Sequence, residues 1–153
     1  MAAGKPHRFD TLVRVRSLQE NQQAQALASV RRHIATVERQ RKAIQQEQQR
    51  VLREAGDRSR RVFDAMDVRR YYEYERYLAR LAVEKDASLQ ELRRVEEDRR
   101  LELDKAIKRR RMVERMQERD AMAWAQQRQR DEQKRTDEAA VGQAAQRRER
   151  GAS

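Results

Sequence analysis

The sequence predicts an all-α protein, a long antiparallel two-helix coiled-coil hairpin with a C-terminal helical overhang. Charged residues make up 41% of the chain and hydrophobic residues 37%, with only four glycines and one proline. That composition is typical of long helices, because a globular core needs more apolar residues and more turns. The apolar residues also recur at helical spacing, which separates this chain from a disordered one of equal polarity.

The first helix is predicted over about residues 9–55. Its apolar residues follow steps of three, four and seven, a heptad seam on one face of a helix: Leu27, Val30, Ile34, Val37, Ile44 and Val51. Phe9, Leu12, Val15 and Leu18 continue the helical spacing toward the N-terminus.

One break is predicted in the middle of the chain, near residues 54–62. Gly56 is expected to adopt the left-handed conformation that ends a helix. Asp57 or Ser59 is then expected to cap the second helix, which runs from about residue 60 to about 140. Residues 1–8 and 141–153 are expected to be disordered tails.

The second helix carries an eleven-residue repeat. Leu81, Leu92 and Leu103 stand eleven residues apart, as do Leu78 and Leu89. This spacing corresponds to about 3.67 residues per turn, so the apolar stripe hardly drifts around a straight helix. At its start, Tyr71, Tyr74, Leu78 and Leu81 follow a 3-4-3 pattern, which predicts that both tyrosines lie in the seam. Tyr72 and Tyr77 then lie outside it.

A turn near residue 58 predicts which residues of the two helices face each other. Residue i of the first helix faces about residue 116 − i of the second. Leu27 then meets Leu89, Ile34 meets Leu81, and Phe9 meets Ile107. Residues beyond about 110 have no partner, although Met112, Val113, Met116 and Trp124 keep helical spacing. Two interpretations of this overhang stay open. It self-associates or frays, or another protein covers its apolar stripe.

The net charge of +11 indicates three classes of anionic partner: nucleic acid, a membrane surface or an acidic protein. Mixed acidic and basic residues favour an ordinary solvated helix surface instead. No basic-region layout or aromatic platform supports nucleic-acid binding. A generic basic coiled-coil scaffold or nucleic-acid binder stays open as the alternative.

The usual catalytic patterns are missing from the sequence. His7 and His33 are isolated, no glycine-rich phosphate loop is found, and a two-helix hairpin is expected to offer no concave pocket. We therefore expect no enzymatic activity, cofactor, metal or small-molecule substrate. Without cysteine, a signal peptide or a membrane-spanning apolar run, the chain is expected to be soluble and cytoplasmic.

Three stretches together resemble the flagellar export protein FliJ family. "YEYERYLARL" (72–81) is similar to the segment that opens the family's second helix, and "RDEQKRTDEAA" (130–140) is similar to its C-terminal signature. "RFDTLVRVRSLQEN" (8–21) resembles the family's N-terminal pattern. The resemblance covers about residues 8–140.

The resemblance implies a non-enzymatic component of the flagellar type III export apparatus, with a coiled coil similar to the stalk of rotary ATPases. The implied partners are the hexameric export ATPase and its regulator, the cytoplasmic part of the membrane export gate, and export chaperones for some members. It also implies a peripheral place at the inner face of the cell membrane. The shorter virulence-type secretion stalk protein, which has the same hairpin, is the alternative within this machine type.

The resemblance also suggests site residues. The family's gate-contacting aromatic and leucine match Tyr77 and Leu81, and Tyr72 joins them because it lies outside the seam. Leu81 is equally well explained as a core residue. The C-terminal signature matches Gln133, Lys134, Asp137 and Glu138, which with Met112, Met116 and Trp124 are expected at the ATPase-facing end.

Overall fold

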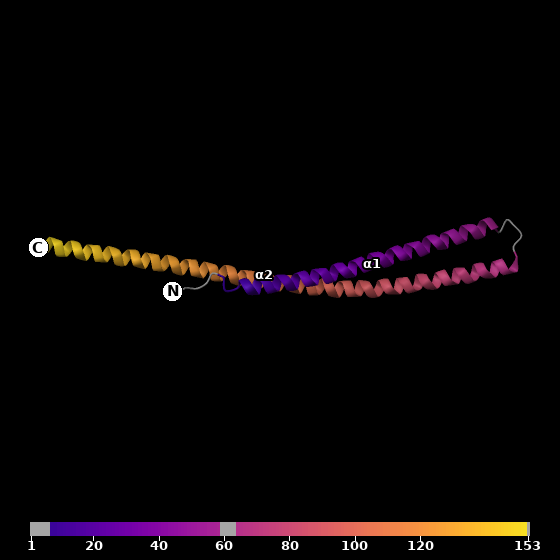
Figure 1. The fold of residues 1–153 in the computed structure, drawn as a ribbon, viewed down its shortest axis with the longest axis horizontal. Helices are drawn as coiled ribbons and strands as arrows, with labels where there is room; N and C mark the ends of the chain where they lie inside the picture. The colour runs from indigo at the N-terminus through magenta and orange to yellow at the C-terminus, as the bar shows by residue number, and fades with distance from the viewer. Residues whose placement is uncertain (1–6, 59–63, 153) are drawn as a thin grey trace. The chain divides into compact units, whose positions relative to one another are not determined.

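The computed structural model describes residues 7–58 and 64–152. Two helices account for nearly all of them, α1 (Asp10–Arg58) and α2 (Ala65–Ala152) (Figure 1). No strand occurs in this described part, and the two long helices pack against each other, so the all-α hairpin prediction is confirmed. None of the helices described is long and apolar enough to cross a membrane.

Contacts divide the chain into two units, which we describe separately. The hairpin unit is Glu20–Lys105, and the terminal unit consists of Met1–Gln19 with Ala106–Ser153. Each unit contains a segment of α1 and a segment of α2.

The core of the hairpin unit is a narrow apolar seam between α1 and α2. Its centre is a cluster of Ile34, Val37 and Leu89, with Val30 and Leu92 packed against it. Four further side chains are buried, Leu27, Val51, Leu78 and Ala82. Ile44, Tyr71, Leu81 and Leu103 are only half-buried.

The pairing of the helices differs from the predicted register by eleven residues. Arg41 Nε donates to Asp86 Oδ1 at 2.9 Å, and Arg31 lies 3.8 Å from Glu96. The predicted register placed residues 75 and 85 at those positions. Ile34 accordingly packs with Leu89 rather than Leu81. Because leucines recur every eleven residues on α2, a shift of three turns brings another leucine to the same place.

The predicted break was wrong in its details. Gly56 and Asp57 lie inside α1, and no glycine among the described residues has a positive φ. Neither residue therefore ends a helix or caps one, while Ser59 lies outside the described residues. The cap of α2 is Asp64: the Met66 N–H donates to its Oδ1 at 3.4 Å, and the Asp67 N–H to its carbonyl at 3.0 Å.

The terminal unit shows the same displacement. Gln117 Nε2 donates to Asp10 Oδ1, and Arg8 lies 3.8 Å from Asp120, whereas residue 106 was predicted opposite residue 10. Ala106 and Val113, which lie in the α2 segment of this unit, are buried. The N-terminal part of α1 therefore covers α2 well past residue 110, where the overhang was expected to begin.

Beyond Trp124 every described side chain of α2 is exposed. The helix continues to Ala152, so residues 141–152 are helical where a disordered tail was expected. At the other end, His7 and Arg8 precede α1, and the rest of the predicted N-terminal tail lies outside the described residues. The overhang of the terminal unit therefore starts later and ends later than predicted.

Candidate partner-binding surfaces

The four tyrosines near the start of α2 form two ring pairs. Tyr71 and Tyr72 meet edge to face with centroids 5.6 Å apart, and Tyr74 and Tyr77 stack at 6.2 Å with planes inclined by 24°. Tyr72 is 55% exposed and Tyr77 49% exposed. Each exposed ring is thus held by a neighbouring tyrosine, and the structure does not bring Tyr72 and Tyr77 together.

Tyr74 of α2 is hydrogen-bonded to a residue of α1. Its hydroxyl donates to Glu47 Oε1 at 2.8 Å, and Arg50 Nε donates to Glu47 Oε2 at 2.9 Å. These hydrogen bonds, from Arg50 first and Tyr74 second, lower the pKa of Glu47 to about 2. Acceptance by Glu47 in turn raises the pKa of Tyr74. Predicted as a seam residue, Tyr74 is exposed and held by its hydroxyl instead of by burial.

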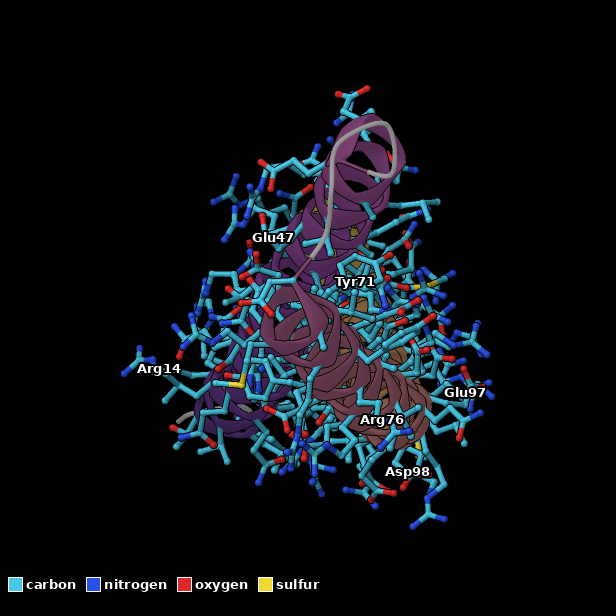
Figure 2. The ribbon with its side chains drawn as sticks, turned by 90° about the vertical axis from the view of Figure 1, so that its right-hand side faces the viewer. Arg14, Glu47, Tyr71, Arg76, Glu97 and Asp98 are labelled. Atoms are coloured by element: carbon cyan, nitrogen blue, oxygen red, sulfur yellow. The ribbon has the colours of Figure 1, made fainter. Side chains whose placement is uncertain are left out.

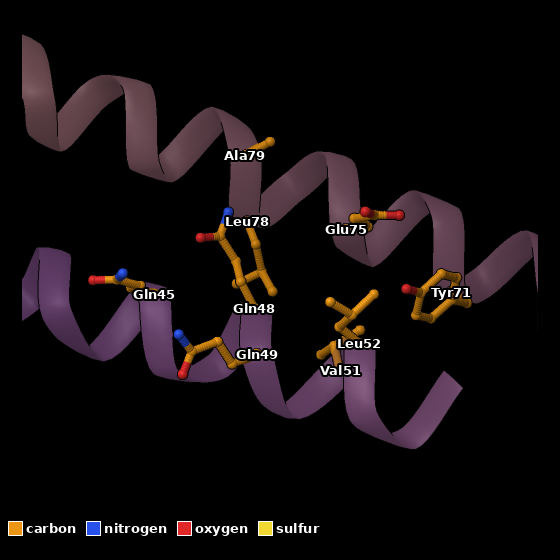
Figure 3. Close-up of a pocket in the computed structure, with 9 residues that line it drawn as sticks. All are labelled: Gln45, Gln48, Gln49, Val51, Leu52, Tyr71, Glu75, Leu78 and Ala79. Carbon is orange, nitrogen blue, oxygen red and sulfur yellow. The ribbon is translucent and has the colours of Figure 1, made fainter. Parts of the chain in front are cut away.

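A small cavity lies beside these rings, between α1 and α2 of the hairpin unit. It measures about 310 Å³ and is lined by Val51, Leu52, Tyr71, Leu78 and several glutamines (Figure 3). Burial raises the pKa of Tyr71, which lies at one end of the cavity. Leu81, by contrast, is half-buried outside the cavity. Of the three predicted gate residues, two are exposed rings and Leu81 has only part of its surface available.

The predicted ATPase-facing residues divide between two kinds of position. Met112 and Met116 are exposed on α2, whereas Trp124 is half-buried. The Arg128 guanidinium lies 4.8 Å from the centroid of the Trp124 ring. The two methionines therefore do not share a face with Trp124.

Farther along α2, all residues of the C-terminal signature are exposed. Gln133 Nε2 donates to Asp137 Oδ1 at 3.2 Å, one turn away. The side chains of Lys134 and Glu138 have no hydrogen bond or ion pair within the part of the chain that the structure describes. The signature thus presents its charges to solvent on a single helix.

Sequence reasoning missed Glu47 and Arg50 as the residues that orient Tyr74. Their three-residue spacing is a recognisable helical ion pair. Their link to Tyr74 was hidden, because the predicted register placed Tyr74 opposite residue 42. Around both helices the remaining surface is densely charged, as the side chains labelled at Arg14, Arg76, Glu97 and Asp98 illustrate (Figure 2). No group of acidic residues and histidines suited to a metal ion occurs among the described residues.

Comparison with known proteins gives one match. No curated protein and no solved structure matches the chain. The family model described as "Flagellar FliJ protein" matches residues 5–149, which include the tyrosine pairs and the exposed C-terminal signature. Since that match spans nearly the whole helical hairpin, the chain belongs to the FliJ family of flagellar export proteins.

Proposed function

We propose that the chain is a non-enzymatic stalk and adaptor of the flagellar type III export apparatus. Family membership makes it a flagellar export component. The finer proposal is that the hairpin unit binds the cytoplasmic part of the membrane export gate, which holds the chain at the inner face of the membrane, while the terminal unit binds the hexameric export ATPase. The ATPase regulator and export chaperones are further partners in this proposal.

The observation that carries the proposal is the pair of exposed tyrosines, Tyr72 and Tyr77. Packing within the hairpin gives no reason for a large ring at 55% or 49% exposure. Both rings are held by neighbours, and Tyr77 stacks on Tyr74, which Glu47 anchors. Rings that are ordered before binding lose little conformational entropy in an interface. Tyrosine also supplies apolar area and a hydroxyl, which suits it to a protein contact.

The ATPase contact is supported by the uncovered part of α2. An isolated helix is marginal in water unless another surface covers it. Residues 125–152 are entirely exposed in the terminal unit, and the signature residues Gln133, Lys134, Asp137 and Glu138 lie there with Trp124 at its start. We assign the ATPase contact to this segment.

The gate contact is tested by changing Tyr72 and Tyr77 to alanine together. Neither ring lies in the buried seam, so the helix content measured by circular dichroism should hardly change. Affinity for the purified cytoplasmic part of the export gate should fall at least tenfold in calorimetric titration, because two interface rings are lost. Val83→Ala, another exposed position on α2, is the matched control and should bind as the wild type does. Unchanged affinity in the tyrosine variant rejects the gate contact.

The ATPase contact is tested by adding the full chain to its cognate export ATPase. The rate of hydrolysis and the fraction of hexamer should both rise. A chain truncated after Trp124 keeps the α1 contacts of Gln117 and Asp120, so it should fold yet lose the stimulation. If neither chain stimulates the ATPase over a wide concentration range, the stalk proposal fails.

A further inference from the structure

One face of α2 in the terminal unit combines arginines, a lysine and methionines. Residues at helical spacing between 108 and 122 share this face, which we call the cationic methionine face: Lys108, Arg109, Arg111, Met112, Arg115, Met116, Arg119 and Met122. All are exposed, and Met112 and Met122 reach 58% and 63%. Exposed methionines between unneutralised cations are unusual for a surface that meets only water.

The cations of this face have no partner within the described chain. The side chains of Lys108, Arg109, Arg111, Arg115 and Arg119 make no hydrogen bond or ion pair to a described residue. Three carboxylates lie on the same turns: Glu114 accepts from Arg110 at 2.7 Å, Asp120 lies 3.8 Å from Arg8, and Glu118 is exposed without an ion pair to a described residue. Five positive charges therefore remain uncompensated by a specific contact over about three turns of helix.

The helix segment is oriented by its contact with α1. Ala106, Val113 and Gln117 lie on the side that α1 covers, as their burial and the bond from Gln117 to Asp10 show. The cationic methionine face occupies the exposed side of the same turns. It is thus presented outward by a packed helix and needs no rearrangement to meet a surface.

We propose that the cationic methionine face binds the surface of an anionic lipid bilayer. Each lysine or arginine near such a surface strengthens binding by roughly fivefold. The long stems of these residues allow their charged ends to reach lipid phosphates while the backbone lies flat. Methionine, unbranched and flexible, can enter the boundary between headgroups and acyl chains.

The methionines favour a bilayer over nucleic acid. Nucleic acid offers phosphates to the cations, but single-strand binding relies on aromatic rings, and none belongs to this face. A groove on a protein normally binds a helix that has one apolar stripe with charged residues at its edges. Here cations and methionines alternate across the whole face, an arrangement that suits a broad, deformable surface.

This inference goes beyond the proposed function and is separable from it. Trp124 and the signature residues, to which the ATPase contact is assigned, lie outside the face. Met112 and Met116, predicted with them at the ATPase-facing end, belong to the face and are assigned to the bilayer instead. The chain truncated after Trp124 should therefore still bind anionic vesicles while failing to stimulate the ATPase. Loss of vesicle binding by that truncated chain contradicts the assignment of lipid binding to residues 108–122.

The experiment measures co-sedimentation of the full chain with vesicles. Vesicles of phosphatidylcholine and phosphatidylglycerol should bind the chain, with affinity falling as salt rises, whereas phosphatidylcholine alone should not. Changing Arg111, Arg115 and Arg119 to glutamine should weaken binding by about a hundredfold. The matched control changes Arg93, Arg94 and Arg99 to glutamine. It removes the same charge from the hairpin unit and should shift the affinity less than threefold.

A second variant tests the methionines. Met112→Ser, Met116→Ser and Met122→Ser together should weaken vesicle binding about tenfold, while circular dichroism shows the helix retained. Equal binding by this variant overturns the proposal, because the face would then act by charge alone. Equal losses in the two arginine variants overturn it as well. So does tighter wild-type binding to duplex DNA than to anionic vesicles at the same ionic strength.

Discussion

Glu47 shows how an exposed residue can connect two helices. Its carboxylate accepts from Arg50 on its own helix and from Tyr74 on α2, and together these bonds bring its pKa to about 2. A carboxyl with a lowered pKa stabilises the fold above its ordinary pKa of 4.5. That contribution is lost as the pH falls from 4.5 toward 2.

Replacing Tyr74 with phenylalanine tests this link. The pKa of Glu47 should rise but stay below 4.5, because Arg50, the larger cause of its lowering, remains. Unfolding midpoints should accordingly depend less on pH between 4.5 and 2 than they do in the wild type. The measurement is an NMR titration of the Glu47 carboxyl carbon, with Tyr72→Phe as the control. An unshifted pKa in Tyr74→Phe rejects the hydrogen bond.

For single residues, the helical period of the sequence was enough to predict which side chains lie outside the seam. Spacing alone placed Tyr72 and Tyr77 off the seam, and both are exposed in the structure. Spacing did not find the Glu47 partner of Tyr74, because a contact between helices depends on the register as well as on the face. What Tyr72 and Tyr77 bind stays a prediction.

At the scale of elements, Gly56 is the instructive case. A glycine in a polar stretch looked like the end of a helix, yet α1 passes through it and ends at Arg58. Glycine permits a left-handed conformation without requiring it, so its presence alone does not locate a helix end. The actual start of α2 is marked instead by Asp64, an ordinary capping residue.

The substitution Gly56→Ala distinguishes a helical Gly56 from a left-handed one, because it changes the free energy of unfolding in opposite directions in the two cases. A Cβ at Gly56 meets no atom within 4 Å, so alanine should raise the free energy of unfolding by about 0.5–1 kcal/mol through its better helix propensity. A left-handed glycine would give the opposite sign. Urea unfolding measures the difference, and destabilisation contradicts the helical Gly56.

Asp64→Ala tests the cap of α2. Loss of the acceptor for the Met66 N–H should lower the free energy of unfolding by about 1 kcal/mol. Asp64→Asn keeps a side-chain acceptor and should cost much less. If both variants unfold at the same urea concentration as the wild type, the cap contributes nothing.

At the scale of the whole molecule, composition and periodicity were enough to predict an antiparallel helical hairpin. They were not enough to predict its register. α1 continues to Arg58 instead of about residue 55, and α2 starts at Ala65 instead of about residue 60, so the pairing moves toward higher residue numbers on α2. The eleven-residue repeat supplies leucines for either alignment. Specific pairs such as Arg41 with Asp86 identify the alignment that forms, and they lie on the surface, where apolar patterns carry no information.

The register of the hairpin unit can be measured by crosslinking, because the chain has no cysteine of its own. Gln40 accepts from Lys85 at 2.9 Å, so cysteines at these two positions should be joined by a short bismaleimide. Cysteines at Gln40 and Arg76, which the predicted register paired, should remain unjoined, because Arg76 lies about two and a half turns of α2 away from Lys85. Efficient joining of the second pair and not the first, read by mass spectrometry, contradicts the register.

The recurrence of leucine along α2 also bears on how this hairpin can change in length. Removing eleven residues from within its repeat deletes three complete turns and returns the following leucine to the vacated position. Removing one or two residues instead rotates every later leucine away from α1. Insertions and deletions that come in elevens therefore leave the composition of the seam intact, and a gene encoding such a helix can lengthen or shorten it without redesigning the core.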